Sequence, residues 1–168
     1  MLLAGAYIDK TIRAFNALNY TMHNLGPIGV GPDSDVLGVW ITYNKEKGQM
    51  IFDMRSYISE IEQMAKEYGL QITKSTLPAP PNTDLFKPKP GTAHVTCSMT
   101  TEHFRSLVYK IMYLAQVTNP IIAWSTQQAA KHVEAIDETH VKWLKNLVSY
   151  IVNNKDILSR YELLRVLS

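Results

Sequence analysis

Residues 37–54 read Leu-Gly-Val-Trp-Ile-Thr-Tyr-Asn-Lys-Glu-Lys-Gly-Gln-Met-Ile-Phe-Asp-Met. Apolar residues alternate with other residues in both halves of this stretch, which is the period of a β-strand with one buried face. Residues 44–48 between the halves supply a polar turn that ends in glycine. The stretch therefore predicts a β-hairpin, and the positions that we expect on its inner side are Leu37, Val39, Ile41, Tyr43, Met50, Phe52 and Met54.

Upstream of the hairpin, the sequence predicts a strand, a helix and an irregular loop. Residues 1–6 are apolar and fit a strand. Residues 25–32 hold three glycines and two prolines, which interrupt regular structure. Between these segments, residues 7–22 predict an amphipathic helix, because apolar residues recur there at helical spacing, at Ile8, Ile12, Phe15 and Leu18.

Downstream, a second amphipathic helix leads into a proline-rich connector. Apolar residues from Tyr57 to Tyr68 share one helical face, and Gly69 is a natural residue to end that helix. Five prolines follow between Ser75 and Gly91. We expect this segment to be extended and mostly unstructured, and to be the best domain boundary in the chain.

The rest of the chain predicts three helices. The first has Thr100 as its N-cap, the second starts at Asn119-Pro120 and runs through Val133, and the third starts after Asp137 and stops at Asn153-Asn154. The pattern leaves open whether residues 157–167 form a strand or a short helix. The fold class that we predict is α+β.

Composition allows one compact core or two small ones that share a surface, because 46% of the 168 residues are hydrophobic. The 17 basic and 15 acidic residues give a formal charge of +2, and the basic residues are scattered. Charge alone therefore does not indicate nucleic-acid binding. No apolar run approaches the roughly 20 residues that cross a bilayer, so we expect no membrane span.

Cys97 is the only cysteine of the chain. It excludes a disulfide within the chain and a zinc site built on cysteine, so we expect an intracellular, reducing compartment. No base lies at helical spacing from Cys97, which favours a small buried hydrophobe over a nucleophile.

Two acidic residues and two histidines are the remaining candidates for metal ligands. Asp33-Ser34-Asp35 lies in a loop rich in glycine and proline with no third ligand nearby, which favours solvated turn residues. His132 and His140 lack the His-Glu-x-x-His spacing, which favours surface or satisfied histidines. We predict no metal site and no cofactor.

The order of these segments resembles the reverse transcriptase of copia-class retrotransposons, from just after the Tyr-x-Asp-Asp catalytic turn to the end of the thumb. The similarity spans almost the whole chain, although each motif consists of a few common residues. The similar runs are Leu2-Leu3-Ala4-Gly5, Asn24-Leu25-Gly26, Leu37-Gly38-Val39-Trp40-Ile41, Tyr57-Ile58, Ser75-Thr76-Leu77-Pro78, Phe104 through Ala115, Thr118-Asn119-Pro120-Ile121-Ile122, and His140 through Ile151.

The resemblance implies an architecture and a missing activity. It implies a partial palm with a primer-grip-like hairpin over residues 1–54, a first thumb-like helix over 55–74, the proline-rich connector over 75–99, a thumb-like three-helix bundle over 100–153 and a C-terminal extension over 154–168. The family's metal-binding aspartates would precede Met1. Polymerases hold two metal ions with such carboxylates, so we expect no polymerase activity from this chain.

The resemblance also implies contacts to the backbone of a primer–template duplex. The candidate nucleic-acid-binding residues are Arg105, Lys110, Lys142 and Lys145. The alternative is a solvated helical face, because acidic residues nearby dilute the positive potential.

Three positions depart from the family pattern. Tyr109 stands where the family has glycine, and a glycine at such a site usually lets a backbone or a partner approach closely. Asn119 and Ile121 replace charged residues of the family. The apolar stripes persist while polar positions have changed, which is expected of a chain kept for its fold or its surface.

Two functions are consistent with this pattern. The first is a non-catalytic remnant that acts as a structural or interaction subunit of a larger assembly, such as a ribonucleoprotein or an organellar complex. The second is a fragment of an active reverse transcriptase that contributes primer–template binding. A half-sheet cut from a palm leaves an open edge, so we expect a protein partner that covers residues 1–6 and the hairpin. RNA or DNA is the other partner that the resemblance suggests.

Overall fold

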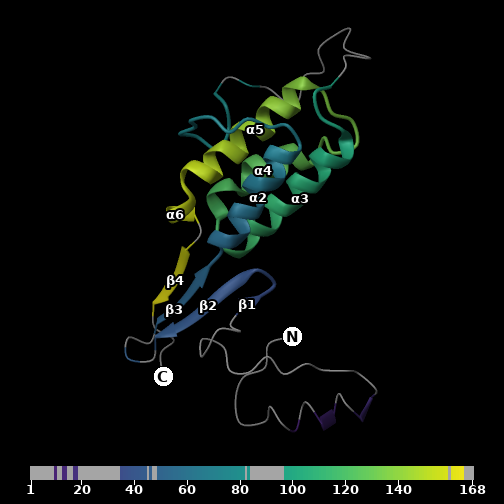
Figure 1. Cartoon of the computed structure of the whole chain (residues 1–168). Helices are drawn as coiled ribbons and strands as arrows, with labels where there is room; N and C mark the ends of the chain where they lie inside the picture. The colour runs from purple at the N-terminus through teal and green to yellow at the C-terminus, as the bar shows by residue number, and fades with distance from the viewer. Residues whose placement is uncertain are drawn as a thin grey trace.

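The computed structural model describes residues 10, 13–14, 17–18, 35–44, 46, 49–81, 83, 97–158 and 160–164. The strand predicted over residues 1–6 and the loop predicted over residues 25–32 lie outside these residues. Most of the helix predicted over residues 7–22 also lies outside them. The described part is α+β, with a helical bundle above a small antiparallel sheet (Figure 1).

The predicted hairpin is confirmed. Strand β2 (Val39–Asn44) pairs antiparallel with β3 (Gln49–Asp53), with Ile41 opposite Phe52. A two-residue strand β1 (Asp35–Val36) lies on the outer side of β2, and β4 (Arg160–Leu164) lies beside β3, giving the order β1-β2-β3-β4. Of the segment 157–167, left open by the sequence, residues 157–158 end the short helix α6 (Lys155–Leu158) and residues 160–164 form strand β4.

The expectation that Leu37 faces inward is wrong. Leu37 and Gly38 form the tight turn between β1 and β2, with φ angles of 57° and 81°. The Leu37 side chain is 80% exposed, because it belongs to the turn and not to the strand whose alternation it seemed to begin. The turn is fixed by Asp35, whose Oδ1 accepts from the backbone N–H of Gly38 at 2.8 Å, and by Tyr113, whose hydroxyl donates to the Leu37 carbonyl at 3.1 Å.

Helix α2 (Arg55–Glu67) follows the hairpin directly and ends as predicted. Gly69 has φ 82°, and its N–H donates to the carbonyl of Lys66 while Leu70 N–H donates to that of Ala65. These two bonds form a Schellman motif, in which a glycine adopts the left-handed conformation at low cost.

The three C-terminal helices are confirmed with one difference. Helix α3 (Thr101–Val117) is capped by Thr100, and α5 (Glu138–Asn153) is capped by Asp137. Between them, the segment from Pro120 begins as the 3-10 turn η1 (Pro120–Ile122) and continues as α4 (Ala123–Ala130). It stops before Val133, because residues 131–136 form tight turns that lead the chain toward α5.

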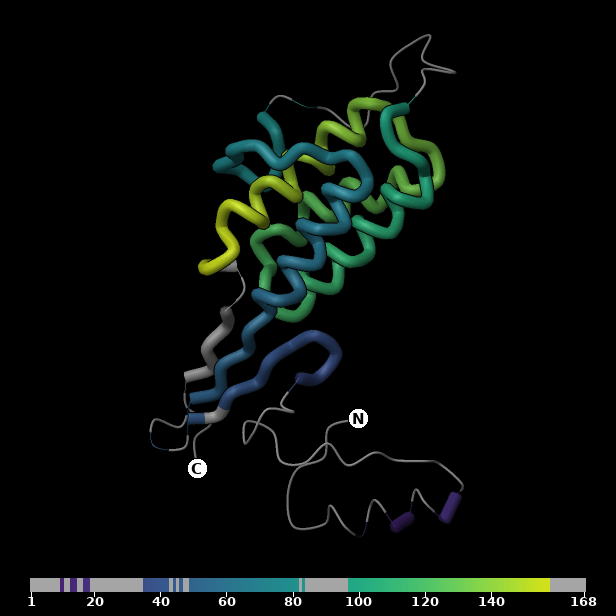
Figure 2. Tube along the Cα trace, in the orientation of Figure 1, coloured from purple at the N-terminus to yellow at the C-terminus, as the bar shows by residue number. Residues whose placement is uncertain are grey.

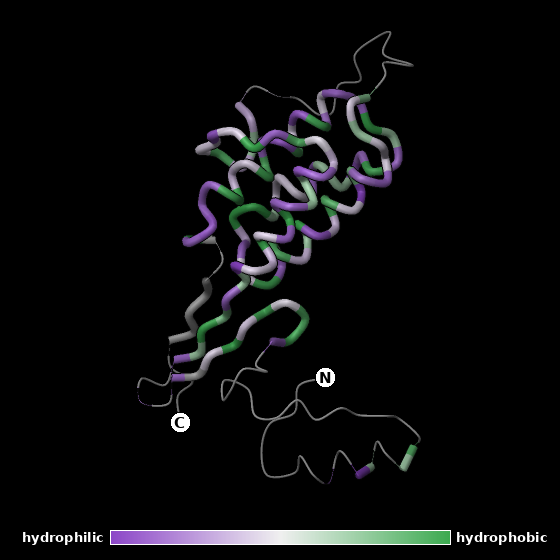
Figure 3. Tube along the Cα trace, viewed as in Figure 1, coloured by the Kyte–Doolittle hydropathy of each residue, from purple (hydrophilic) through white to green (hydrophobic). Residues whose placement is uncertain are grey.

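Helices α2, α3, α4 and α5 pack into one bundle (Figure 2), in which α2 and α4 each contact both α3 and α5. Apolar and polar residues alternate along these helices (Figure 3), and the apolar ones meet in a single core. Its largest fully buried members come from both sides of the connector and are Met54, Ile58, Ile61, Phe104, Leu107, Val108, Ile111, Leu114, Ile122, Leu144, Leu147 and Ile151.

Residues 71–81, which lead from α2 into the proline-rich connector, form no helix or strand, but they are anchored to α5. Ser149 Oγ accepts from the N–H of Thr73 at 3.1 Å, and Asn153 Nδ2 donates to the Thr73 carbonyl at 2.7 Å. Asn146 Nδ2 likewise donates to the Leu77 carbonyl at 2.9 Å. Side chains of α5 thus supply the hydrogen bonds that this backbone does not make within a regular element.

We expect Gly38→Ala to destabilise the protein by roughly 2–3 kcal/mol and Gly69→Ala by about 1 kcal/mol. Both glycines have a positive φ, but a Cβ on Gly38 would lie 3.0 Å from Cδ2 of Tyr57, whereas a Cβ on Gly69 would meet nothing within 4 Å. The Tyr57 ring has little freedom to yield, because its hydroxyl donates to the carbonyl of Lys110. Urea denaturation of the two variants measures the difference, and equal losses would show that the ring is not fixed.

Candidate nucleic-acid interface

The two predicted basic residues of α3 are both engaged within the fold. Arg105 Nη2 lies 2.9 Å from Oε1 of Glu134, in the turn that follows α4. Lys110 Nζ lies 2.7 Å from Oε2 of Glu60 on α2 and 4.7 Å from the centroid of the Tyr57 ring. Arg105 therefore faces the α4 side of α3, and Lys110 faces the α2 side.

The Lys110 contact is part of a packed group at the foot of the bundle. The Tyr57 hydroxyl donates to the Lys110 carbonyl at 3.2 Å, and the Tyr57 and Tyr113 rings are 5.4 Å apart. Burial, followed by the proximity of Tyr113 and Glu60, raises the pKa of Tyr57 to about 12. The phenol thus stays a hydrogen-bond donor at all ordinary pH values, and it fixes the position of the Lys110 backbone.

The two predicted basic residues of α5 have a different environment. Lys142 is exposed and Lys145 is half-buried on the outer side of α5. Neither has an ion pair with a described residue. Glu138, in the first turn of α5, precedes Lys142 by four residues on the same helix face and accepts from Ser98. No Asp or Glu occurs between Thr139 and Asn154, so Glu138 is the only acidic residue of α5.

The structure therefore brings together two of the four predicted residues. Lys142 and Lys145 share one helix, whereas Arg105 and Lys110 lie on α3, across the bundle from α5 (Figure 2). A single stretch of nucleic-acid backbone would have to follow the α5 side or the α3 side.

Sequence reasoning missed Lys74, which lies just before the connector in a segment anchored to α5. Its neighbours Thr73 and Ser75 bind Ser149 and Asn146 of α5, and Lys74 itself is exposed without an ion pair among the described residues. An open hollow of about 620 Å³ lies here, lined by Ile72, Thr73, Lys74, Ser75, Thr76, Asn153 and Asn154. The sequence signal that could have pointed to Lys74 is the absence of any Asp or Glu from residue 70 to residue 83.

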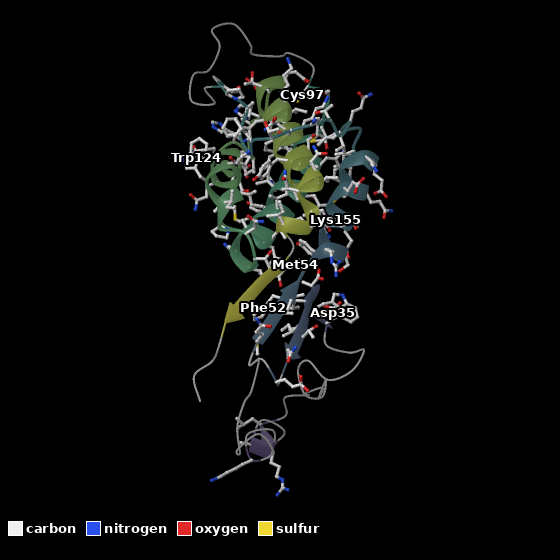
Figure 4. All side chains as sticks on the ribbon, turned by 90° about the vertical axis from the view of Figure 1, so that its left-hand side faces the viewer. Asp35, Phe52, Met54, Cys97, Trp124 and Lys155 are labelled. Atoms are coloured by element: carbon white, nitrogen blue, oxygen red, sulfur yellow. The ribbon has the colours of Figure 1, made fainter. Side chains whose placement is uncertain are left out.

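The candidate metal ligands of the sequence analysis make other contacts wherever the structure describes them. Asp33 and Ser34 lie outside the described residues, and Asp35 binds the Gly38 N–H. The ring centroids of His132 and His140 are 4.3 Å apart, a contact that the sequence did not predict. Cys97 is a half-buried free thiol at the end of the bundle away from the sheet (Figure 4). No group of three or more His, Cys, Asp or Glu side chains suited to a metal ion occurs in the described part of the chain.

Several large apolar side chains are exposed on the described surface. On the sheet side they include Leu37 and Trp40, with Ile157 on α6. On the bundle they include Ile121 and Trp124, and Figure 4 shows Trp124 projecting from α4. Tyr109, which stands at the family's glycine position, is also exposed.

No protein-family model matches the chain, and no solved structure matches it. Among the described helices, none has the length and apolar character needed to span a membrane.

We expect a double-mutant cycle of Lys110→Ala and Glu60→Ala to give a coupling free energy of about 0.5–1 kcal/mol. The ion pair is partly shielded on the lysine side, and the lysine also lies over Tyr57. Urea denaturation of the two single variants and the double variant measures the coupling. A coupling free energy of zero would mean that Glu60 does not hold Lys110, which would then be as available for an external partner as Lys142. The matched single-variant control is Lys142→Ala.

Proposed function

We propose that this chain is a non-catalytic remnant of a copia-class reverse transcriptase that serves as a structural or interaction subunit of a larger assembly, such as a ribonucleoprotein or an organellar complex. In this proposal the hairpin corresponds to part of the palm, and α2 corresponds to the first thumb-like helix. Helices α3 to α5 correspond to the thumb-like three-helix bundle. The order of the confirmed hairpin and helices is what this architecture requires.

The observation that carries the proposal is the exposure of Trp40 on the hairpin. Val39 and Ile41 on either side of it point into the core, so Trp40 points to the opposite face of the sheet, where it is 41% exposed. Ile51 and Thr42 lie on that same face, because Thr42 pairs with Ile51 and Trp40 pairs with Asp53. A tryptophan with an aliphatic neighbour on a sheet face is typical of the centre of a protein–protein interface.

The exposed turn beside Trp40 extends this face. Leu37 is held outward by a left-handed backbone that leucine rarely adopts, and Tyr113 fixes that backbone from α3. An exposed leucine in an unfavourable conformation is more easily explained by a partner that covers it than by the stability of the isolated chain. The partner that we propose for the hairpin would bury Trp40 and Leu37 together.

We expect Trp40→Ala to weaken association with the partner by roughly 30-fold or more, because the loss of a central interface tryptophan costs about 2 kcal/mol or more. Thr42→Ala, an exposed change on the same strand and face, is the matched control and is expected to leave association unchanged. The measurement is size-exclusion chromatography of the tagged chain from its native source, followed by titration of the co-eluting protein. A wild-type chain that elutes as a monomer, or a Trp40→Ala chain that binds as tightly, would contradict the proposal.

The second candidate function is a contribution to primer–template binding as part of a larger polymerase. Lys142 and Lys145 favour it, because they have no ion pair with a described residue and because Glu138, in the first turn, is the only acidic residue of their helix. Phosphate contacts by such lysines make binding depend on salt concentration.

For this second function, we expect Lys142→Ala and Lys145→Ala together to reduce the slope of log K against log salt concentration by roughly 2, which is about 1 for each lost phosphate contact. Arg105→Ala is the control, because its guanidinium is already paired with Glu134. Fluorescence anisotropy of a labelled RNA–DNA hybrid measures the binding. An unchanged slope in the Lys142→Ala/Lys145→Ala chain would exclude the α5 face as the binding surface.

A further inference from the structure

Two histidines that are eight residues apart in the sequence meet where the chain turns from α4 into α5. Their ring planes are inclined by 33°, and their centroids are 4.3 Å apart. His140 lies in the first turn of α5 and is only 9% exposed. His132 lies in the preceding turn, so the ring contact joins the two ends of the short segment 132–140.

The contact coincides with the N-terminal cap of α5. Asp137 Oδ1 accepts from the N–H groups of Thr139 at 2.7 Å and His140 at 3.1 Å. In return, Nδ1 of His140 accepts from the N–H of Asp137 at 2.9 Å, which completes a capping box. A glutamate or glutamine usually fills this third helical position, and neither side chain titrates near neutral pH as histidine does.

The capping box requires a neutral His140. A ring nitrogen that accepts a hydrogen bond carries no proton, so the proton of the neutral ring is on Nε2. That atom is buried and has no hydrogen-bond partner among the described residues. Nδ1 also lies 2.9 Å from Oδ1 of Asp137, a contact that becomes an ion pair when the ring is protonated. The polar contacts of this buried imidazole therefore depend on its protonation state.

We propose that His140, His132 and Asp137 form a proton-sensitive latch on the turn between α4 and α5, closed while the His140 imidazole is neutral and open when it is protonated. A proton taken from solvent by Nδ1 of His140 converts the acceptor of the Asp137 N–H into a donor. This change removes one of the two hydrogen bonds of the capping box. It favours opening of residues 131–137 and fraying of the first turn of α5.

The charges around the latch act in both directions. Burial lowers the pKa of His140, the Asp137 carboxylate opposes this effect, and His132 adds to it, so that the pKa lies below its usual value. Helix α4 contains no charged residue. The other acidic and basic residues of the segment 131–138 have partners of their own: Glu134 with Arg105 of α3, Glu138 with Ser98, and Lys131 with Gln128.

The direction of the pH dependence follows from this depressed pKa. As pH falls below the ordinary histidine pKa of about 6.5, the unfolded chain binds the proton before the folded chain does. The stability that the neutral latch contributes is therefore present above this pKa and decreases as pH falls toward the lower pKa of the folded protein.

The matched test replaces His140 by glutamine, which keeps an acceptor at the same capping position but does not titrate. We expect the Tm of the wild-type chain to fall by roughly 2–4 °C between about pH 7.5 and about pH 5.5 through this latch. We expect this contribution to the decrease in Tm to be absent from the His140→Gln chain. The control is His103→Gln, which changes a histidine stacked on Tyr68 elsewhere in the bundle. We expect its Tm to decrease with pH as that of the wild-type chain does.

Amide hydrogen exchange of the wild-type protein is the second measurement, and it does not depend on any variant folding. We expect faster exchange at the acidic pH for the N–H groups of Asp137, Thr139 and His140, after correction for the intrinsic rates. We expect the amides of α3 to keep their protection. Unchanged protection of the cap, or the same pH dependence of Tm in His140→Gln and the wild type, would overturn the proposal.

Discussion

The burial of Met54 is the constraint on which the rest of the structure depends. Met54 is the single residue between β3 and α2, and its side chain is fully buried. The hydroxyl of Thr118, at the end of α3, approaches its sulfur at 3.5 Å. Because no flexible linker separates the strand from the helix, the direction of the hairpin is set by how α2 packs against α3 and α5.

The apolar periodicity of the sequence was sufficient to predict the hairpin and the principal helices. The caps Thr100 and Gly69 were also recognisable, because each depends on one side chain or one φ angle within a few residues. Leu37 was wrongly predicted to face inward for an equally local reason, because the alternation of apolar residues that includes Val39 also includes Leu37, which belongs to the turn. Strand β4 could not be predicted, because its partner β3 is more than a hundred residues away and its own pattern was ambiguous.

The candidate basic residues show the limit of sequence reasoning about sites. Arg105 and Lys142 look equivalent in sequence, since each lies on an amphipathic helix with charged neighbours. Their difference comes from Glu134, which reaches Arg105 from another element. Lys74 and the contact of His132 with His140 were missed for the complementary reason, because packing between distant segments creates both environments.

The place of β4 in the sheet has a consequence for how the chain folds during synthesis. Strands β2 and β3 are neighbours in sequence and can pair as soon as they emerge, but the outer edge of β3 is completed only when residues 160–164 follow. Until then, an apolar strand offers open backbone donors and acceptors to any other nascent chain. The interval between making the hairpin and making β4 is therefore the period in which this polypeptide depends most on chaperones.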